Sequence, residues 1–247
     1  WVKAKKESDY TIFKPHLGTL IKLLRQYAEC QGYHDRLYDA LLDEYEPWMT
    51  TAELEKVFIG LKSRLVSLFD KVVASKKKSD IGILTRSYPV DRQREFGMMI
   101  LEKMGFHFDR GRLDVSAHPF TTTLGADDVR LTTRYNEHFF PSAVFGTIHE
   151  GGHGLYELGF APALRGSILA NGASLGIHES QSRLWENMVG RSLSFWKAFY
   201  PALKEKFPEA LGDVPLEDFY RAINAVSPSL IRVEADEVTY NLHIILR

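Results

Sequence analysis

The pentapeptide His149-Glu150-Gly151-Gly152-His153 constrains the fold of this chain more than any other feature of its sequence. Residues i and i+4 of an α-helix lie on one face with Cβ atoms about 5–6 Å apart, so both imidazoles can bind one metal ion. The glutamate beside the first histidine can reach a water molecule on that ion. The spacing therefore predicts a helix that carries two metal ligands, His149 and His153, and a general base, Glu150, as in zinc hydrolases.

The residues around this pentapeptide predict that its helix has about four turns. Pro141 suits the first turn of this helix, because the N–H groups of the first turn have no partner within the helix and proline lacks an N–H. Apolar or small residues then recur at helical spacing, namely Val144, Phe145, Ile148, Gly152 and Leu155.

A catalytic zinc site has three protein ligands and one open position, so a third ligand is expected downstream. Glu179 is the first candidate, because it follows a glycine-rich connector that lets the chain turn back. Glu186 and Glu157 are the alternatives for this role.

A long amphipathic helix is predicted in the first third of the chain. Thr50 and Glu53 form a capping-box pattern at its start. We expect its apolar face to belong to the core; this face consists of Leu54, Val57, Phe58, Leu61, Leu65, Leu68 and Val72.

Hydrophobic periodicity predicts further helices over most of the chain. One includes residues 20–27, and another is expected to begin at an Asp91 cap and to end at Gly105. Apolar positions over residues 184–196 predict the helix that would carry Glu179 near its start.

Residues 106–135 differ from the rest of the chain, because they are rich in Thr, Val, Phe and Gly with local alternation. This pattern predicts two or three short strands. An extended peptide can add to such a sheet edge as a further strand. The expected fold class is therefore mainly α, a helical zinc peptidase with a small sheet beside the active-site cleft. No repeat or linker divides the sequence, so we expect a single mostly helical core over residues 1–247.

Composition excludes several classes of partner. The 31 Lys and Arg against 32 Asp and Glu give no basic excess for nucleic acid. No apolar run approaches the roughly 18 residues that span a bilayer. The single cysteine, Cys30, excludes an internal disulfide, favours a reducing compartment and is expected in the core. We therefore expect a cytoplasmic protein without nucleic-acid or membrane partners.

Several motifs occur in a fixed order along the chain. They are Asp109-Arg110-Gly111, His118-Pro119-Phe120, residues 128–135, the pentapeptide, His178-Glu179-Ser180-Gln181-Ser182-Arg183 and residues 231–237. This series resembles the carboxypeptidase Taq family of zinc metallocarboxypeptidases. The resemblance covers most of the chain from Tyr88 to Arg247.

The resemblance implies a function. A member of this family releases C-terminal amino acids from peptides that have a free terminal carboxylate. Its expected metal is Zn²⁺, with Co²⁺ as the alternative, and the full-length protein is expected to be a homodimer. The expected metal ligands are His149, His153 and Glu179, with Glu150 as the catalytic base.

The resemblance also implies roles for residues outside the ligand set. Arginine binds a carboxylate through two parallel hydrogen bonds, so Arg232 is expected to hold the terminal carboxylate, with Arg247 as the second candidate. His178 is expected to orient a metal ligand. The donor to the oxyanion is one of His178, Tyr240, His243 or the C-terminal motif of the family. Other residues expected at the cleft or in structural ion pairs are Asp109, Arg110, His118 and Arg183.

The sequence departs from the family in one respect. The family motif Gly-x-x-Gln-Asp-x-His-Trp is absent, and family members are about twice as long as these 247 residues. The chain is therefore expected to be an interior fragment that lacks N-terminal and C-terminal parts of the full-length fold. Two other functions stay open: another helical zinc peptidase, such as an oligopeptidase or endopeptidase, or an inactive fragment that only folds and docks with its missing segments.

Overall fold

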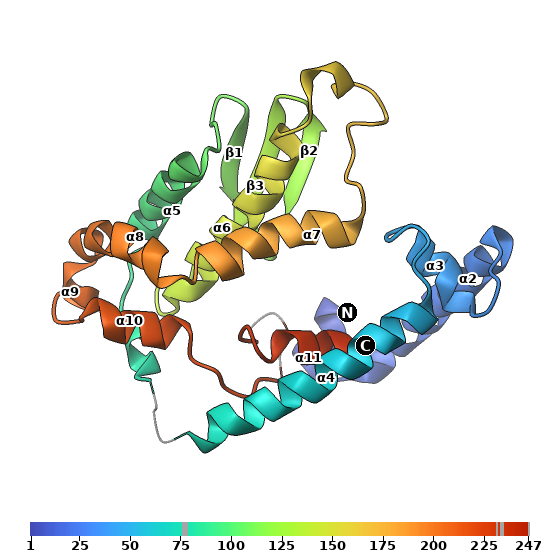
Figure 1. Cartoon of the computed structure of the whole chain (residues 1–247), viewed down its shortest axis with the longest axis horizontal. Helices are drawn as coiled ribbons and strands as arrows, with labels where there is room; N and C mark the ends of the chain where they lie inside the picture. The colour runs from blue at the N-terminus through green and yellow to red at the C-terminus, as the bar shows by residue number, and fades with distance from the viewer. Residues whose placement is uncertain (76–78, 231, 233–234, 247) are drawn as a thin grey trace. The chain divides into compact units, whose positions relative to one another are not determined.

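The structure, a computed structural model, describes residues 1–75, 79–230, 232 and 235–246. It divides into two compact units, Trp1–Leu61 and Lys62–Arg247. Helix α4 (Thr51–Ala74) runs across the boundary without a break (Figure 1). Among the described residues, none of the helices combines the length and the apolar content that a bilayer crossing requires. The expected mainly helical class is confirmed, whereas the single core over residues 1–247 stays a prediction.

The first unit consists of helices and no strand among its described residues. Its elements are α1 (Val2–Glu7), η1 (Tyr10–Ile12), α2 (Lys14–Gln31), α3 (Leu37–Asp43) and the start of α4. The predicted capping box is confirmed, because the Thr50 amide donates to Glu53 Oε2 at 3.0 Å and the Glu53 amide donates to Thr50 Oγ1 at 3.3 Å.

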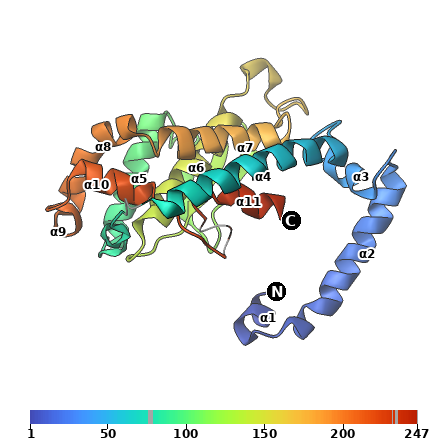
Figure 2. The ribbon, with the colours of Figure 1, turned by 60° about the horizontal axis from the view of Figure 1, so that its bottom comes forward.

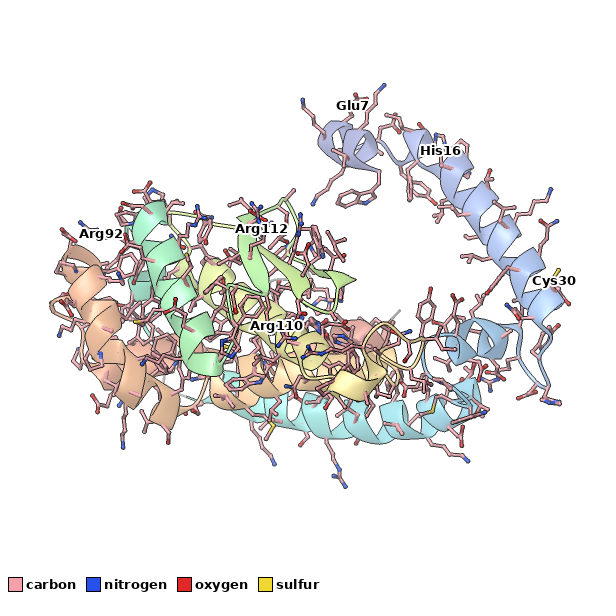
Figure 3. The ribbon with its side chains drawn as sticks, turned by 90° about the horizontal axis from the view of Figure 1, so that it is seen from above. Glu7, His16, Cys30, Arg92, Arg110 and Arg112 are labelled. Carbon is pink, nitrogen blue, oxygen red and sulfur yellow. The ribbon has the colours of Figure 1, made fainter. Side chains whose placement is uncertain are left out.

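The apolar faces of α2 and α4 are not part of a core in the described structure. Leu23 on α2 is 55% exposed and Val57 on α4 is 60% exposed. Cys30 is also exposed, near the end of α2 (Figure 3). The expectation that the α4 stripe and Cys30 are core residues is therefore wrong. Periodicity shows that a helix has an apolar face but cannot show what covers that face.

The second unit contains a three-stranded sheet in the order β1-β3-β2 (Figure 1). Its strands are β1 (Gly111–Val115), β2 (Thr121–Gly125) and β3 (Asp128–Thr133). Strand β3 pairs in parallel with β1 and antiparallel with β2, so β2 lies at an edge. The prediction of two or three strands is confirmed. Helix α6 (Phe140–Leu158) packs against β3, and the buried side chain of Leu131 contributes to this interface.

Further helices complete the second unit (Figure 2). They are η2 (Ile81–Thr85), α5 (Val90–Met104), η3 (Pro162–Leu164), α7 (Leu175–Arg183), the π-helical segment η4 (Leu184–Val189), α8 (Leu193–Lys206), α9 (Pro208–Leu211), α10 (Leu216–Ile223) and α11 (Tyr240–Ile245). Aromatic side chains dominate the core, where Trp196 lies 4.7 Å from Phe219 and 6.4 Å from Phe96 between ring centroids. These contacts pack α5, α8 and α10 against one another.

Two predicted helix boundaries need correction. Helix α5 begins at Val90, and Asp91 lies in its first turn without a capping hydrogen bond, although the predicted end at Gly105 is confirmed by a left-handed φ of 96°. The prediction of a single helix over residues 184–196 is wrong, because η4 ends at Val189 and α8 begins at Leu193. The Ser192 hydroxyl accepts the Phe195 amide at 3.1 Å and caps α8, a signal that competes with the apolar periodicity.

Candidate metal centre

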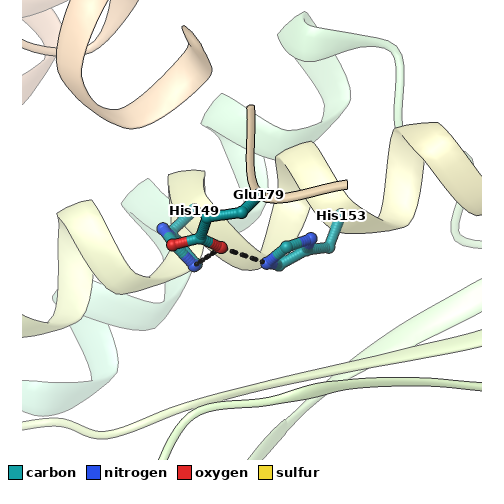
Figure 4. A group of neighbouring side chains, drawn as sticks. All are labelled: His149, His153 and Glu179. Atoms are coloured by element: carbon teal, nitrogen blue, oxygen red, sulfur yellow. Dashed lines mark ion pairs between the residues drawn. The ribbon is translucent and has the colours of Figure 1, made fainter. Parts of the chain in front are cut away.

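Helix α6 presents the two histidines of the pentapeptide on one face. Its residue Pro141 lies in the first turn, as the sequence predicts, and much of the helix is buried between the sheet and α5. His149 and His153 are one turn apart, with ring centroids 4.9 Å from each other. Both rings are partly buried and point toward α7 (Figure 4).

Helix α7 brings a carboxylate to these imidazoles. The Ser174 hydroxyl caps α7 by accepting the Ile177 amide at 3.1 Å. Glu179 Oε2 lies 3.5 Å from His149 Nε2 and 3.2 Å from His153 Nε2 (Figure 4). One ligand atom from each of the three residues lies within 4.8 Å of the others. In the part of the chain that the structure describes, no other group of His, Cys, Asp or Glu side chains meets this criterion. Two imidazole nitrogens and one carboxylate oxygen suit a divalent metal of the zinc type.

The outer nitrogen of His149 is held by Glu186, which projects from η4. His149 Nδ1 lies 2.8 Å from Glu186 Oε2, so a proton on Nδ1 leaves the Nε2 lone pair for a metal. Burial lowers the pKa of His149, but the hydrogen bond and charge of Glu186, with the charges of Glu179 and Glu150, raise it above its ordinary value. Arg183 Nη1 in turn donates to Glu186 Oε2 at 3.2 Å. Glu186, which Arg183 holds in place, therefore sets the orientation of the His149 imidazole without itself being one of the three candidate ligands.

The outer nitrogen of His153 begins a second chain of hydrogen bonds. His153 Nδ1 lies 2.6 Å from His178 Nδ1, and His178 Nε2 lies 2.7 Å from Glu157 Oε1. The Thr123 hydroxyl donates to the other oxygen of Glu157 at 2.8 Å. In a consistent assignment, Nε2–H of His178 donates to the carboxylate and Nδ1–H of His153 donates to His178, which again leaves the Nε2 lone pair of His153 for a metal. Tyr156 stacks on His178 at 4.4 Å between ring centroids.

The Glu179 carboxylate is ionised at neutral pH. Burial raises its pKa, but the hydrogen bond with His153 and the charges of His149 and Arg183 outweigh burial and lower the pKa to about 2. Ser182 Oγ donates to Oε2 at 3.0 Å, and Arg183 Nε donates to Oε1 at 3.2 Å. These contacts fix the orientation of an anionic candidate ligand.

Glu150 lies beside the cluster, on the side of α6 that meets β2. Its side chain is buried, and Oε2 accepts a hydrogen bond from the Thr121 hydroxyl at 2.7 Å. The same hydroxyl lies 3.1 Å from the Glu150 carbonyl oxygen. The edge strand therefore orients the carboxylate that comes after His149 in the sequence.

Arg232 is linked to the cluster through two side chains. Its Nη1 donates to the Tyr240 hydroxyl at 3.0 Å, and the Arg183 guanidinium lies 4.0 Å from the Tyr240 ring centroid. Arg183 contacts Glu179 directly. Arg232 Nε is buried and has no hydrogen-bond partner among the described residues. Arg247 lies outside the described residues.

The structure does not bring the upstream motif residues into this cluster. Arg110 Nε donates to Asp127 Oδ1 at 2.5 Å and thereby ties the start of β1 to the turn between β2 and β3. Asp109 and His118 are exposed, and the half-buried His243 lies in α11. Within the described part of the chain, no hydrogen bond or ion pair joins these side chains to the three candidate ligands.

Several contacts of the site were not assigned from the sequence. The sequence predicts Glu157 and Glu186 as alternative ligands, whereas in the structure both accept hydrogen bonds from imidazoles; Glu157 lies four residues after His153 on the same helix face. That spacing was a signal for a supporting role. Thr121 and Thr123 carry no comparable signal, because their contacts depend on how the sheet packs against α6.

We expect Glu186→Gln to weaken metal binding by about 10- to 100-fold, because an amide gives the His149 Nδ1–H a weaker acceptor than a carboxylate. Competition with a chelator of known affinity would measure the effect. Glu209→Gln is the matched control, since Glu209 is exposed and pairs with Arg92 at 3.1 Å away from the site. Equal affinities of Glu186→Gln and the parent would contradict this role.

Comparisons with known proteins agree with the geometry. The profile of the carboxypeptidase Taq (M32) metallopeptidase family matches residues 1–247. Carboxypeptidase 1 of Bacillus subtilis is 47% identical over 247 residues, which are 100% of this chain and 49% of the relative. Thermostable carboxypeptidase 1 of Thermus thermophilus is 49% identical over 256 residues, and the match covers 100% of this chain and 50% of the relative.

Solved structures show the same similarity. A Pyrococcus furiosus carboxypeptidase structure matches with a TM-score of 0.94 at 45% identity and covers 100% of this chain and 50% of that protein. An M32 carboxypeptidase from Deinococcus radiodurans matches with a TM-score of 0.93 at 42% identity, covering 99% of this chain and 49% of that one. The chain spans about half the length of the curated relatives it matches. On this similarity, the chain belongs to the carboxypeptidase Taq (M32) family of metallopeptidases.

Proposed function

We propose that the complete protein, meaning this chain with any residues that flank it, is a zinc carboxypeptidase that releases C-terminal residues from peptides. The observation that carries this proposal is the approach of His149 Nε2, His153 Nε2 and a Glu179 oxygen to one another, with Glu150 beside them. Membership of the carboxypeptidase Taq (M32) family supports the reaction class.

His149, His153 and Glu179 would hold the zinc ion, and Co²⁺ is the alternative. Such an ion, when bound, polarises the scissile carbonyl and lowers the pKa of its water to about 7. The protein's own part is to keep both imidazoles in the tautomer that offers Nε2, which the bonds to Glu186 and His178 support.

Glu150 takes the proton of the attacking water and passes it to the departing amine. The Thr121 hydroxyl keeps this carboxylate turned toward the reacting atoms by holding Oε2. His178 uses both ring nitrogens in bonds to His153 and Glu157, so we assign it an orienting role. The Tyr240 hydroxyl accepts from Arg232 and retains its own proton as a donor for the developing oxyanion.

Arg232 is the residue that we propose for the substrate's terminal carboxylate, with Arg247 as the second candidate. A planar guanidinium suits a carboxylate because it donates two parallel hydrogen bonds. The link from Arg232 through Tyr240 and Arg183 to Glu179 supports a position near the metal ligands.

We expect Arg232→Met to raise KM for free-acid peptides by roughly 30-fold or more, since removing one partner of a buried charge pair costs at least about 2 kcal/mol. Peptides with an amidated C-terminus lack the carboxylate and should keep their KM. Steady-state kinetics on matched peptide pairs would measure both values in the complete protein. Arg221→Met is the control, because Arg221 is exposed and pairs only with the nearby Asp218 in the described contacts. Equal effects on both peptides would favour an endopeptidase or oligopeptidase, which needs no carboxylate clamp.

A chain that only folds and docks with missing segments is the remaining alternative. Metal analysis of the purified chain after dialysis, together with identification of the amino acids that it releases, separates this alternative from a carboxypeptidase. One bound metal per chain supports the proposed centre, and absence of bound metal excludes it.

We further propose that the complete protein is a cytoplasmic homodimer. The single Cys30 suits a reducing compartment, and the dimer rests on the family resemblance. Sedimentation velocity at several concentrations would test the dimer.

A further inference from the structure

Helices α6 and α7 approach each other closely at Gly152 in the pentapeptide. A Cβ atom placed on Gly152 would lie 2.7 Å from Ser182 Cα, 3.0 Å from the Gln181 carbonyl oxygen and 3.2 Å from the Ser182 amide nitrogen. These are backbone atoms, so no side-chain rotation could relieve the contact. Any residue larger than glycine would therefore push α7 away by several tenths of an ångström.

The same contact lies one helical turn from the third candidate ligand. Ser182 is fully buried, and the single proton of its hydroxyl is shared between Glu179 Oε2 at 3.0 Å and the Glu179 carbonyl oxygen at 2.8 Å. Glu179 Oε2 is also the oxygen nearest to His153 Nε2. The position of Ser182 against α6 thus sets how far the carboxylate reaches toward the imidazoles.

We propose that the contact between Gly152 and Ser182 positions the metal-binding carboxylate of Glu179. The proposal rests on the metal centre of the proposed function and adds a role for the fourth residue of the pentapeptide. Gly152 and Ser182 do not touch the metal position, so they act as positioning residues through Glu179.

Gly151 provides a matched comparison within the same motif. A Cβ atom there would lie 2.5 Å from Leu101 Cδ2 and 3.1 Å from Met104 Cε. Both atoms are ends of flexible side chains on α5, which lies on a different side of α6 from α7. Gly151→Ala adds the same methyl group to the same helix without displacing the backbone that carries Glu179.

We expect Gly152→Ala to weaken metal binding by about 10- to 100-fold, the loss typical when the support of a metal ligand is disturbed. Gly151→Ala should keep an affinity within about threefold of the parent. Chelator competition measures both affinities, and visible absorption of the Co²⁺-loaded proteins reports the ligand geometry. Circular dichroism and the thermal midpoint of each metal-free variant show whether the fold is retained.

A parental affinity and Co²⁺ spectrum in a folded Gly152→Ala variant would overturn the inference. If the parent itself binds no metal, the proposed function fails instead, so the two failures are distinguishable. Should Gly152→Ala not fold, Ser182→Ala decides the matter, because it keeps the glycine contact and removes the hydroxyl that holds Glu179. A severalfold loss of affinity in folded Ser182→Ala supports the inference, and an unchanged affinity overturns it.

Discussion

Replacing Glu150 with glutamine should lower kcat for peptide hydrolysis by about 10²- to 10⁴-fold, the usual contribution of a general acid–base group. Glutamine has nearly the same shape as glutamate and can keep the hydrogen bond from Thr121, but it cannot take the proton of the attacking water. Metal stoichiometry should stay at the parental value, because Glu150 is not among the three residues whose ligand atoms meet.

The measurement compares kcat and bound metal in the complete protein and its Glu150→Gln variant. Glu102→Gln on α5 is the control, since Glu102 is exposed and belongs to no part of the site. A Glu150→Gln variant that keeps the parental kcat would show that another group moves the proton. Loss of metal and activity together would instead give Glu150 a role in holding the metal centre.

Removing an imidazole should have the largest effect on metal binding. Structural zinc sites with four ligands bind with about 10–16 kcal/mol, so one ligand accounts for roughly 2.5–4 kcal/mol, or about 10²- to 10³-fold in affinity. We therefore expect His153→Ala to lose its metal during dialysis against a weak chelator that leaves the parent loaded. The loss also leaves His178 without the partner that its Nδ1 now has at 2.6 Å.

Elemental analysis of dialysed protein would test this expectation for His153→Ala and, in parallel, His149→Ala. The exposed His107, in the turn before β1, gives His107→Ala as the control. Retention of one metal per chain in His153→Ala would show that the metal binds at other residues and would remove the chemical basis of the proposed function.

Helical periodicity explains why the two histidines and the base were predictable. Their geometry is local, because the spacing of His149 and His153 decides which face both share once the helix forms. Glu179 is different, since it reaches the cluster across a connector and its position depends on the packing of α7 against α6. The need for a third ligand and the glycine-rich connector made Glu179 the first candidate, but Glu157 and Glu186 stayed as alternatives until the resemblance favoured Glu179.

The contacts and boundaries that the sequence did not predict have one physical origin. A side chain such as Thr121 reaches Glu150 only because the edge strand packs beside α6, and no pattern within either segment records that packing. The apolar faces of α2 and α4 show the converse, since their amphipathic periodicity is present although no residue of the α4 face is fully buried in the described structure. The break at Gly190 was missed because the apolar spacing continues across it.

The widened turn of η4 makes the number of residues in that segment more important for the position of Glu186 than the identity of most of its side chains. The Gly190 amide donates to the Trp185 carbonyl oxygen at 2.7 Å, five residues back instead of four. Removing one residue after Arg183 would rotate the downstream residues by about 100° and turn Glu186 away from His149. A substitution at an outward position such as Met188, which is 72% exposed, should therefore disturb the site less than the insertion or deletion of one residue in this segment.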